Sequence, residues 1–526
     1  MHDVALLVAA AAVAHLFARW LQASAVPFLL VAGAVAVRVA HFSEAFLGDA
    51  VVLGASFLLF TAGMDLSARR VRSQAGMALR VGTAQFLALA AVGFGAGVVL
   101  GYSALEGAYL ALALTASSTL VGIRVLKRRR QMFEPFGRLV LGVLLLQDLL
   151  VVLSVPLVLG IATGGLAAWQ TTSGVALLTG LTLVARRWVG PLLVRVEREG
   201  ELVLLAALSL LFVFTAVSVW TGVPGVVAAF LAGVSLSSFP VDGVVRPYLT
   251  PIADFFGAIF FTALGALVVA PTLAQVGQAV LLAALLAGVT IPLVASLAVR
   301  SGLSVRAALE AGLLLSQTSE ISLVLVLSGW LQGHIGEDVF TVVALVTMLT
   351  ILATPLLATD RVALRLAHLL PQRTPSPAPA PTGHVLVLGA GATGAALLED
   401  LILADCRLVV VDDDPSLVGR LRDAGIQVVR GDVSDPRVLD AAGASDASLI
   451  VSTLHHPHDV STVLAHASGV PVLVRVFDAP EAEWVRGHGG EPVHFYEASA
   501  HLLLEWVEEE REWLDEMMAA RTPPRR

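Results

Sequence analysis

Long apolar windows separated by short polar connections occupy the first two thirds of the chain. Up to residue 360 we count thirteen windows, each long enough to cross a bilayer as a helix. We expect these spans at 4–20, 25–42, 48–65, 77–100, 107–126, 136–162, 171–192, 202–219, 223–239, 254–270, 278–299, 306–331 and 339–358. The pattern therefore predicts a polytopic α-helical membrane domain.

The pattern changes after a Pro- and Ala-rich stretch that reads as a semi-extended linker. From His384 onward, short apolar runs of strand length alternate with helical stretches, which is typical of β–α units with a parallel sheet. We divide the chain into a membrane domain (1–360), a linker (361–383) and an α/β Rossmann-like domain with a C-terminal helix (384–526).

Composition agrees with a multi-span membrane protein: 57% of the residues are hydrophobic and the mean hydropathy is +0.84. The one cysteine, Cys406, excludes an intrachain disulfide and a cysteine-based metal cluster. No basic leader precedes the first apolar window, so we expect that window to be retained as a helix.

Charge predicts the orientation. The net charge of −8 combines +5 before His384 with −13 from there on. The basic residues of the membrane domain lie mainly in loops after odd-numbered spans: Arg69, Arg70, Arg72, Arg124, Lys127, Arg128, Arg129, Arg130, Arg195, Arg198, Arg246, Arg300 and Arg306. The positive-inside rule then places the N-terminus outside and the C-terminal domain in the cytoplasm.

Asp148 lies inside the apolar run 139–153, next to Gln147. A carboxylate at the bilayer centre costs about 2.5–3.5 kcal/mol, so it needs a partner or a function. One proton or one monovalent cation could neutralise it. Gln147 could offer its carbonyl to a cation and its amide to the backbone. The ordinary alternatives are a carboxylate satisfied by a hydroxyl or an Arg, and an amide that bonds a neighbouring helix.

Two polar interruptions occur in spans five and twelve. The first comprises Thr115, Ser117, Ser118 and Thr119, and the second ends in Glu320. Such residues can satisfy the backbone where a membrane helix is broken, although small residues also serve close helix packing. The two spans are seven apart and run in opposite directions, as an inverted repeat requires. Glu320 could pair with an Arg, bind a cation or stabilise the break.

These segments resemble Kef-type potassium:proton antiporters of the cation:proton antiporter-2 superfamily. The resemblance rests on 144–149 around Asp148, with 59–66, 113–119, 225–235, 255–265 and 315–320 in the same order. It implies a dimerisation region, a mobile core with two broken helices crossing beside Asp148, elevator-like alternating access and a bacterial cytoplasmic membrane. The lysine that many relatives carry in span eleven is absent, because Lys127 is the only lysine, and Thr318-Ser319 replaces a Gly-Gly pair.

One titrating aspartate without a second adjacent acid favours one proton per cation and electroneutral exchange. We expect potassium as the preferred ion, with sodium as the alternative. A potassium channel is a second alternative, disfavoured because no carbonyl filter of the Thr-Val-Gly-Tyr-Gly type occurs. We expect a transporter rather than an enzyme. The candidate ion and proton ligands are Asp148, Gln147, Thr115, Ser117, Ser118, Thr119 and Glu320.

A glycine-rich turn follows the first expected strand of the C-terminal domain. Gly389, Gly391, Thr393 and Gly394 lie between a strand and a helix, and Asp412 ends the next strand about twenty residues later. This arrangement is typical of dinucleotide binding, with phosphates at the helix N-terminus and ribose hydroxyls at the carboxylate. A carboxylate there disfavours the 2′-phosphate of NADP.

The same domain resembles the RCK, or TrkA-N, ligand-binding domain. The resemblance adds Asp432, Thr453 and Arg475 to a site for NAD(H), AMP or another adenine nucleotide, and Asp413 is included although it also fits a solvated turn. No catalytic group for hydride transfer is evident, so the nucleotide is expected to regulate. The amphipathic tail 497–518 suggests a homodimer. No metal site or nucleic-acid face is expected, and an ancillary regulatory subunit is left open.

Overall fold

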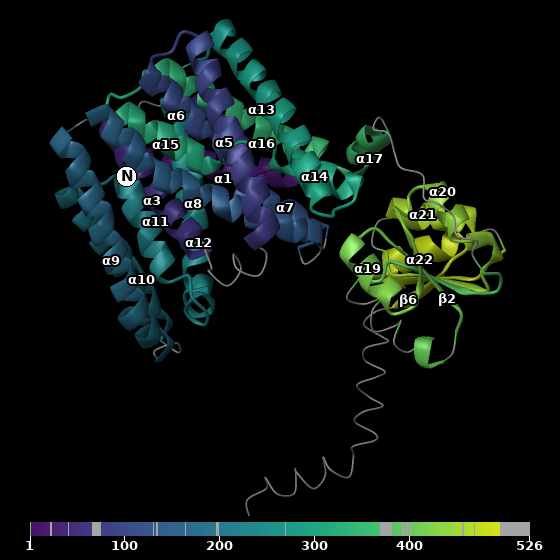
Figure 1. Ribbon diagram of the computed structural model, residues 1–526. Helices are drawn as coiled ribbons and strands as arrows, with labels where there is room; N and C mark the ends of the chain where they lie inside the picture. Colours follow the sequence, from purple (N-terminus) through teal and green to yellow (C-terminus); the bar gives the residue numbers. More distant parts are fainter. Residues whose placement is uncertain are drawn as a thin grey trace, which may run out of the picture. The chain divides into compact units, whose positions relative to one another are not determined.

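The structure is a computed structural model that describes residues 2–21, 24–39, 42–65, 75–129, 131–132, 135–163, 165–195, 199–268, 270–368, 381–391, 394, 398, 401–404, 406–454, 457–467 and 469–494. The chain divides into two compact units (Figure 1). A helical unit holds Met1–Ser301 and Val305–Leu369, and an α/β unit runs from Leu370.

The described helices of the first unit are α1 (His2–Trp20), α2 (Ala25–Val39), α3 (Glu44–Asp65), α5 (Ala75–Val99), α6 (Ala104–Thr115), α7 (Thr119–Arg128), α8 (Pro135–Thr163), α9 (Gly165–Arg195), α10 (Gly200–Thr221), α11 (Gly225–Ser235), α12 (Val241–Leu267), α13 (Leu273–Arg300), α14 (Val305–Leu315), α15 (Glu320–Leu331), α16 (Glu337–Leu357) and α17 (Asp360–His368). Eleven described segments are long and apolar enough to cross a membrane, if α6 with α7 and α14 with α15 count as one segment each. The shorter apolar helices α2 and α11 bring the total to the thirteen expected spans.

Two boundaries differ from the sequence prediction. Span ten begins at Val241 rather than near 254, because Val244, Val245 and Leu249 are buried and the helix accommodates two prolines. The first part of the expected linker is helical: α17 buries Ala363 and packs on α14. An amphipathic helix thus continues the first unit up to His368.

The membrane helices pack in two sets. One set contains α1, α2 and α3 with α9, α10, α11 and α12, and the other contains α5, α6, α7 and α8 with α13, α14, α15 and α16. In the second set α6 lies beside α15, so the first half of one broken helix contacts the second half of the other (Figure 1). Spans one to three thus pack with spans eight to ten, and spans four to six with spans eleven to thirteen. This is the arrangement expected of two inverted repeats separated by span seven.

Glycines make the first set dense through two reciprocal contacts. A Cβ on Gly63 of α3 would lie 2.1 Å from the carbonyl oxygen of Phe230, and one on Gly233 of α11 would lie 1.9 Å from that of Phe60. Gly33 of α2 and Gly265 of α12 form the same kind of contact, at 1.9 Å and 2.0 Å from the opposing carbonyl oxygens. Small residues of this kind let membrane helices touch through their backbones.

The second unit contains a six-stranded parallel sheet in the order β3-β2-β1-β4-β5-β6. The strands are β1 (Val385–Leu388), β2 (Leu408–Asp412), β3 (Gln427–Arg430), β4 (Leu449–Ser452), β5 (Val472–Val476) and β6 (Glu491–His494). The described helices are α19 (Pro415–Asp423), α20 (Pro436–Ala441), α21 (Pro457–His466) and α22 (Ala479–Gly487), with a short 3₁₀ turn η1 (Ala444–Asp446).

Side chains of β1 and β2 are buried on both faces of this sheet. Leu386 and Val409 belong to one apolar cluster, whereas Val387 and Val410 belong to the other. Burial on both faces explains why these strands read as continuous apolar runs in the sequence. The strand order reverses between β1 and β4, and ligands of open α/β sheets bind at such a switch point.

Candidate ion-binding site

Both polar interruptions break their helices. Between α6 and α7 the residues Ala116–Ser118 are not helical, and between α14 and α15 the residues Ser316–Ser319 are not. Each second half starts behind a serine cap: the Ser118 hydroxyl accepts a bond from the N–H of Val121 and the Ser319 hydroxyl accepts one from the N–H of Ile321, both at 3.2 Å. Side-chain caps thus supply the backbone partners that a broken helix loses.

The two breaks are bonded to each other. The Ser117 hydroxyl donates to the Leu315 carbonyl at 2.8 Å, and the Ser322 hydroxyl donates to the Ala113 carbonyl at 2.6 Å. The side-chain amide of Gln317 donates to the Ser118 carbonyl at 3.5 Å. These bonds join residues about two hundred positions apart in the sequence, so the broken helices cross at this point.

Adjacent hydroxyls of the first break hold two buried carboxylates. Thr119 Oγ1 donates to Asp148 Oδ2 at 2.9 Å, and Ser118 Oγ donates to Glu320 Oε1 at 2.6 Å. The exposed fractions of Asp148 and Glu320 are 4% and 6%. Asp148 Oδ1 is buried and has no hydrogen-bond partner among the described residues. Asp148 therefore has one oriented oxygen and one oxygen free to take a proton or a cation.

Two of the other expected ligands form hydrogen bonds with the backbone rather than with Asp148. The Oε1 atom of Gln147 accepts a bond from the Ser117 N–H at 3.2 Å, so its side-chain carbonyl is bonded to the backbone. Its NH2 group has no hydrogen-bond partner among the described residues. This orientation is the reverse of the expected one. Thr115 Oγ1 donates to the Leu112 carbonyl of its own helix at 2.7 Å and closes the end of α6.

Hydroxyls occupy the positions where the sequence departs from the related antiporters. Thr290 of α13, in the region of the absent lysine, is fully buried. Thr318 is held by α16, because its hydroxyl donates to Thr347 Oγ1 at 2.9 Å and its N–H donates to Thr350 Oγ1 at 3.2 Å. Contacts with α16 thus stabilise the second break in the absence of glycine. The only lysine of the chain, Lys127, is exposed on the last turn of α7.

Gln85 of α5 also lies at the crossing, and sequence reasoning did not find it. It is fully buried, and its amide donates to the Leu315 carbonyl at 3.3 Å, the same oxygen that Ser117 binds. The signal in the sequence was a single amide near the middle of an apolar window.

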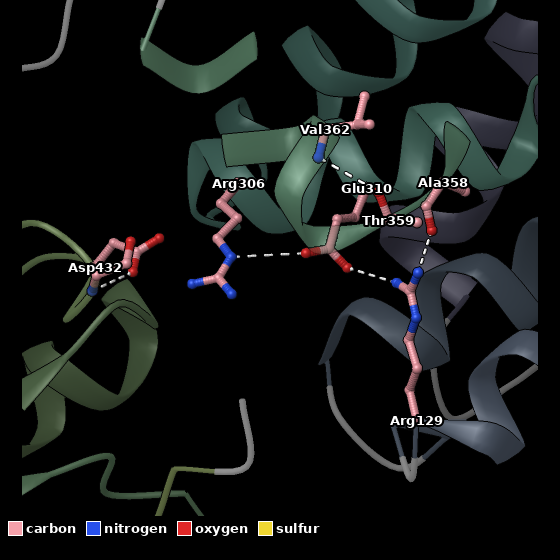
Figure 2. A network of polar contacts seen from close by, with 8 residues as sticks. Arg129, Arg306, Glu310, Ala358, Thr359, Val362 and Asp432 are labelled. Carbon is pink, nitrogen blue, oxygen red and sulfur yellow. Dashed lines mark hydrogen bonds and ion pairs between the residues drawn. The ribbon is translucent and has the colours of Figure 1, made fainter. Parts of the chain in front are cut away.

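Glu310, the remaining deep acid of span twelve, is paired with arginines (Figure 2). Its Oε2 lies 3.2 Å from Arg129 Nη1 and its Oε1 lies 3.7 Å from Arg306 Nε. Arg129 is the C-cap of α7 and also donates to the carbonyl of Ala358, just past α16. The carboxylate therefore links the ends of α7 and α16 to α14.

The glycine-rich turn of the second unit lies at the switch point of the sheet. Gly389 has a φ of +83°, which favours glycine, and its carbonyl accepts a bond from Thr453 Oγ1 at 2.7 Å. A Cβ on Gly394 would lie 2.4 Å from the Gly389 carbonyl oxygen, whereas Gly391 faces open space. Open space at the middle glycine is what close approach of a phosphate requires.

Asp412 closes this turn from the neighbouring strand. Its Oδ2 accepts a bond from the Ala390 N–H at 2.7 Å, and its Oδ1 accepts one from the Asp414 N–H at 2.9 Å. Burial raises the pKa of the Asp412 carboxyl, against these two bonds, which lower it. Asp413, beside it, is partly exposed.

The remaining expected nucleotide ligands are divided between two places. Arg475 donates to the Thr453 carbonyl at 2.6 Å, so these two residues meet beside Gly389. Asp432 follows β3 and accepts a bond from the Ser434 N–H at 2.9 Å in a turn. Thr393 and the tail 497–518 lie outside the described residues.

Comparison with protein families decides the assignment. Residues 5–359 match the model described as "Sodium/hydrogen exchanger, transmembrane", and residues 385–489 match the TrkA-N domain. The chain belongs to the sodium/hydrogen exchanger family. This exchanger is a multi-pass membrane protein with a C-terminal Rossmann-like domain of the TrkA-N type, which confirms the expected fold class and family.

Curated relatives carry both parts. The exchanger is 27% identical over 489 residues to the "Putative cation/proton antiporter YbaL" of Escherichia coli (strain K12), with 87% of each chain covered. It is 26% identical over 436 residues to the "Glutathione-regulated potassium-efflux system protein KefC" of Enterobacter sp. (strain 638), covering 80% of this chain and 68% of that one. Both names describe transport and neither describes an enzyme.

A solved structure shares the membrane fold. The sodium proton antiporter MjNhaP1 of Methanocaldococcus jannaschii superposes with a TM-score of 0.53 at 17% identity, covering 70% of this chain and all but 1% of that one. At this identity the likeness concerns the fold alone.

Proposed function

We propose that the exchanger trades one potassium ion for one proton at Asp148. The observation that carries this proposal is the state of its buried carboxylate: one oxygen is oriented by Thr119, and the other has no partner among the described residues. An unpartnered acceptor in a desolvated site needs a proton or a cation. Competition between the two for one oxygen couples their movements.

The surroundings of Asp148 support a one-for-one exchange. Glu320 is bonded to Ser118, and the only lysine, Lys127, is exposed at the end of α7 and does not balance a second charge at the crossing. Protonated Asp148 and cation-bound Asp148 then carry the same net charge. Exchange between these two forms moves no net charge across the membrane and is electroneutral.

Separation of the membrane helices into two sets supports an elevator-like movement. The crossing lies within the set that contains α6, α7, α14 and α15, whereas the reciprocal glycine contacts fasten the other set. A set fastened in this way can remain fixed while the other carries the site across the membrane. We place the N-terminus outside, the second unit in the cytoplasm of a bacterium and the exchanger in a homodimer.

Sodium is the second candidate, since the matching family model is named for sodium. Potassium is preferred because the relative KefC is named as a potassium-efflux protein and aligns over both units. Neutral oxygens outnumber carboxylates at the crossing, and neutral carbonyls and hydroxyls can replace the hydration shell of potassium.

Reconstituted vesicles loaded with a pH-sensitive dye test the proposal. A potassium gradient should drive proton flux in the unaltered exchanger, and Asp148→Asn should abolish it. Asp254→Asn is the matched control, because Asp254 is an exposed aspartate of α12. Undiminished flux in Asp148→Asn would refute the proposed site. Proton flux driven by a sodium gradient and not by a potassium gradient would identify sodium as the transported ion.

We also propose that an adenine nucleotide, NAD(H) or AMP, regulates transport from the second unit. The support is the open turn at Gly391, the adjacent Asp412 and the meeting of Thr453 with Arg475 at the switch point. Titration calorimetry with NADH, AMP and NADPH should show binding of the first two and much weaker binding of NADPH.

A pH series sharpens the nucleotide assignment. Ribose hydroxyls donate to the ionised form of Asp412, whose pKa is raised by burial. Binding then favours deprotonation, so affinity for NADH should rise with pH until Asp412 is fully ionised and then level off. Asp412→Asn should weaken binding and flatten this dependence. An unchanged pH profile in that variant would show that Asp412 does not bind the nucleotide.

A further inference from the structure

We propose that the side-chain carbonyl oxygens of Gln85 and Gln317 are additional ligands of the transported cation and determine its selectivity. The inference rests on the proposed function, because it assumes that a cation enters the crossing beside Asp148. It adds residues from α5 and from the second break, which were absent from the candidate ligands identified in the sequence.

Both amides are fixed with their oxygen unused. The NH2 group of Gln85 donates to the Leu315 carbonyl at 3.3 Å, and that of Gln317 donates to the Leu314 carbonyl at 3.1 Å. A carbonyl can accept only from the NH2 end, so turning either amide over would place oxygen against oxygen. Both Oε1 atoms are buried and have no hydrogen-bond partner in the part of the chain that the structure describes.

Both amides are connected to the candidate proton site. Gln85 shares the Leu315 carbonyl with Ser117, whose own N–H holds Gln147. Gln317 bonds the carbonyl of Ser118, the residue before Thr119, which holds Asp148. Each unused oxygen thus belongs to the same hydrogen-bonded crossing as the unused oxygen of Asp148.

The chemistry of these atoms points to a cation. Among the described residues, Asp148 Oδ1, Gln85 Oε1 and Gln317 Oε1 are buried acceptors of the crossing that have no hydrogen-bond partner. Leaving buried acceptors unsatisfied is costly, so such groups indicate an absent ligand. A cation that has lost part of its water shell needs several oxygens at once, and one carboxylate with neutral carbonyls supplies them at a net charge of zero. Gln147 cannot play this part in the described geometry, since its oxygen is occupied.

Vesicle transport with shortened amides tests the assignment. Gln85→Asn and Gln317→Asn should each raise the KM for potassium about tenfold and change the ratio of potassium to sodium transport. The pH profile, set at Asp148, should stay as in the unaltered exchanger. A merely structural role would instead lower the maximal rate for both ions with the same KM. Gln332→Asn is the matched control, because Gln332 is an exposed amide after α15.

Two further measurements keep the test decisive. If the asparagine variants do not fold, Gln85→Met and Gln317→Met preserve the volume and should show the same rise in KM. In the unaltered exchanger, potassium but not choline should slow hydrogen exchange in peptides covering 80–88 and 312–320, and absence of this protection would overturn the inference. An unaltered exchanger with no cation-driven proton flux contradicts the proposed function itself. Normal KM and selectivity in the variants, with Asp148→Asn inactive, contradict only the amide assignment.

Discussion

The two halves of the membrane unit share their packing but differ in their chemistry. Counted from the first residues of α6 and α14, the caps Ser118 and Ser319 occupy the same position. Thr119 and Glu320 also occupy equal positions, yet one supplies a hydroxyl and the other a carboxylate. Both repeats contain a broken helix with a serine cap at the same position, and each half contributes a different side chain to one site.

The first halves of the broken helices show the same contrast. Tyr109 and Glu310 are equivalent positions in α6 and α14. The Tyr109 hydroxyl lies 3.0 Å from Nδ1 of His334 in the connection after α15, whereas Glu310 forms an ion pair with Arg129 after α7. Each first half is therefore tied to the connection after the other broken helix, once through neutral groups and once through charges.

Glu310→Gln should have the largest effect on stability. Removal of this carboxylate breaks its ion pairs with Arg129 and Arg306, and breaking a buried ion pair costs about 3–5 kcal/mol. Tyr109→Phe at the equivalent position removes one hydrogen bond and should cost about 0.5–1.5 kcal/mol. Denaturant unfolding of both variants in mild detergent measures the difference, and equal losses would contradict the contrast.

Glycine substitutions should show that the packing is alike in both halves. Gly63→Ala and Gly265→Ala each force a methyl group against a carbonyl about 2 Å away and should each destabilise the exchanger by about 1–3 kcal/mol. Gly48→Ala, on the same helix as Gly63, is the control, because its Cβ would meet nothing within 4 Å. Unfolding in detergent should show that the control variant is as stable as the unaltered exchanger or more stable. A large loss of stability in only one of the other two variants would show that the packing differs between the halves.

Alanine at the two caps should separate structure from transport. Ser118→Ala and Ser319→Ala each lose a cap worth about 1 kcal/mol, so both should unfold slightly more easily. Both hydroxyls donate to Glu320, Ser118 to Oε1 at 2.6 Å and Ser319 to Oε2 at 3.5 Å, so loss of the shorter bond should slow transport about tenfold in Ser118→Ala and less in Ser319→Ala. Equal transport rates in the two variants would indicate that the shorter bond from Ser118 has no particular role in exchange.

Much of this fold could be predicted from the sequence. Hydroxyl runs located both breaks, because serine and threonine are the residues that can cap a helix inside an apolar segment. Short apolar runs and the glycine turn after the first of them predicted the parallel sheet. Span ten was placed too late because its first turns contain Asp242, Arg246 and two prolines, which resemble a loop until burial is known.

Side-chain partners could not be predicted in the same way. The oxygen of Gln147 and that of Gln85 look equivalent in the sequence, and only the neighbouring N–H or carbonyl decides which one is free. Likewise, the sequence shows Glu310 as an acid within an apolar span, but its partner Arg129 comes from the end of another helix. Contacts between residues far apart in the sequence decide these roles.

Lys127 gives the exchanger a practical property that follows from its composition. It is the only lysine in 526 residues and it is exposed at the end of α7, while the only thiol, that of Cys406, is partly exposed in the second unit. Apart from the terminal amine, the unmodified protein therefore offers one site for an amine-reactive dye and one for a thiol-reactive dye. A fluorophore pair attached there would report, without any mutation, whether adding a nucleotide alters the separation between a broken transport helix and the TrkA-N domain.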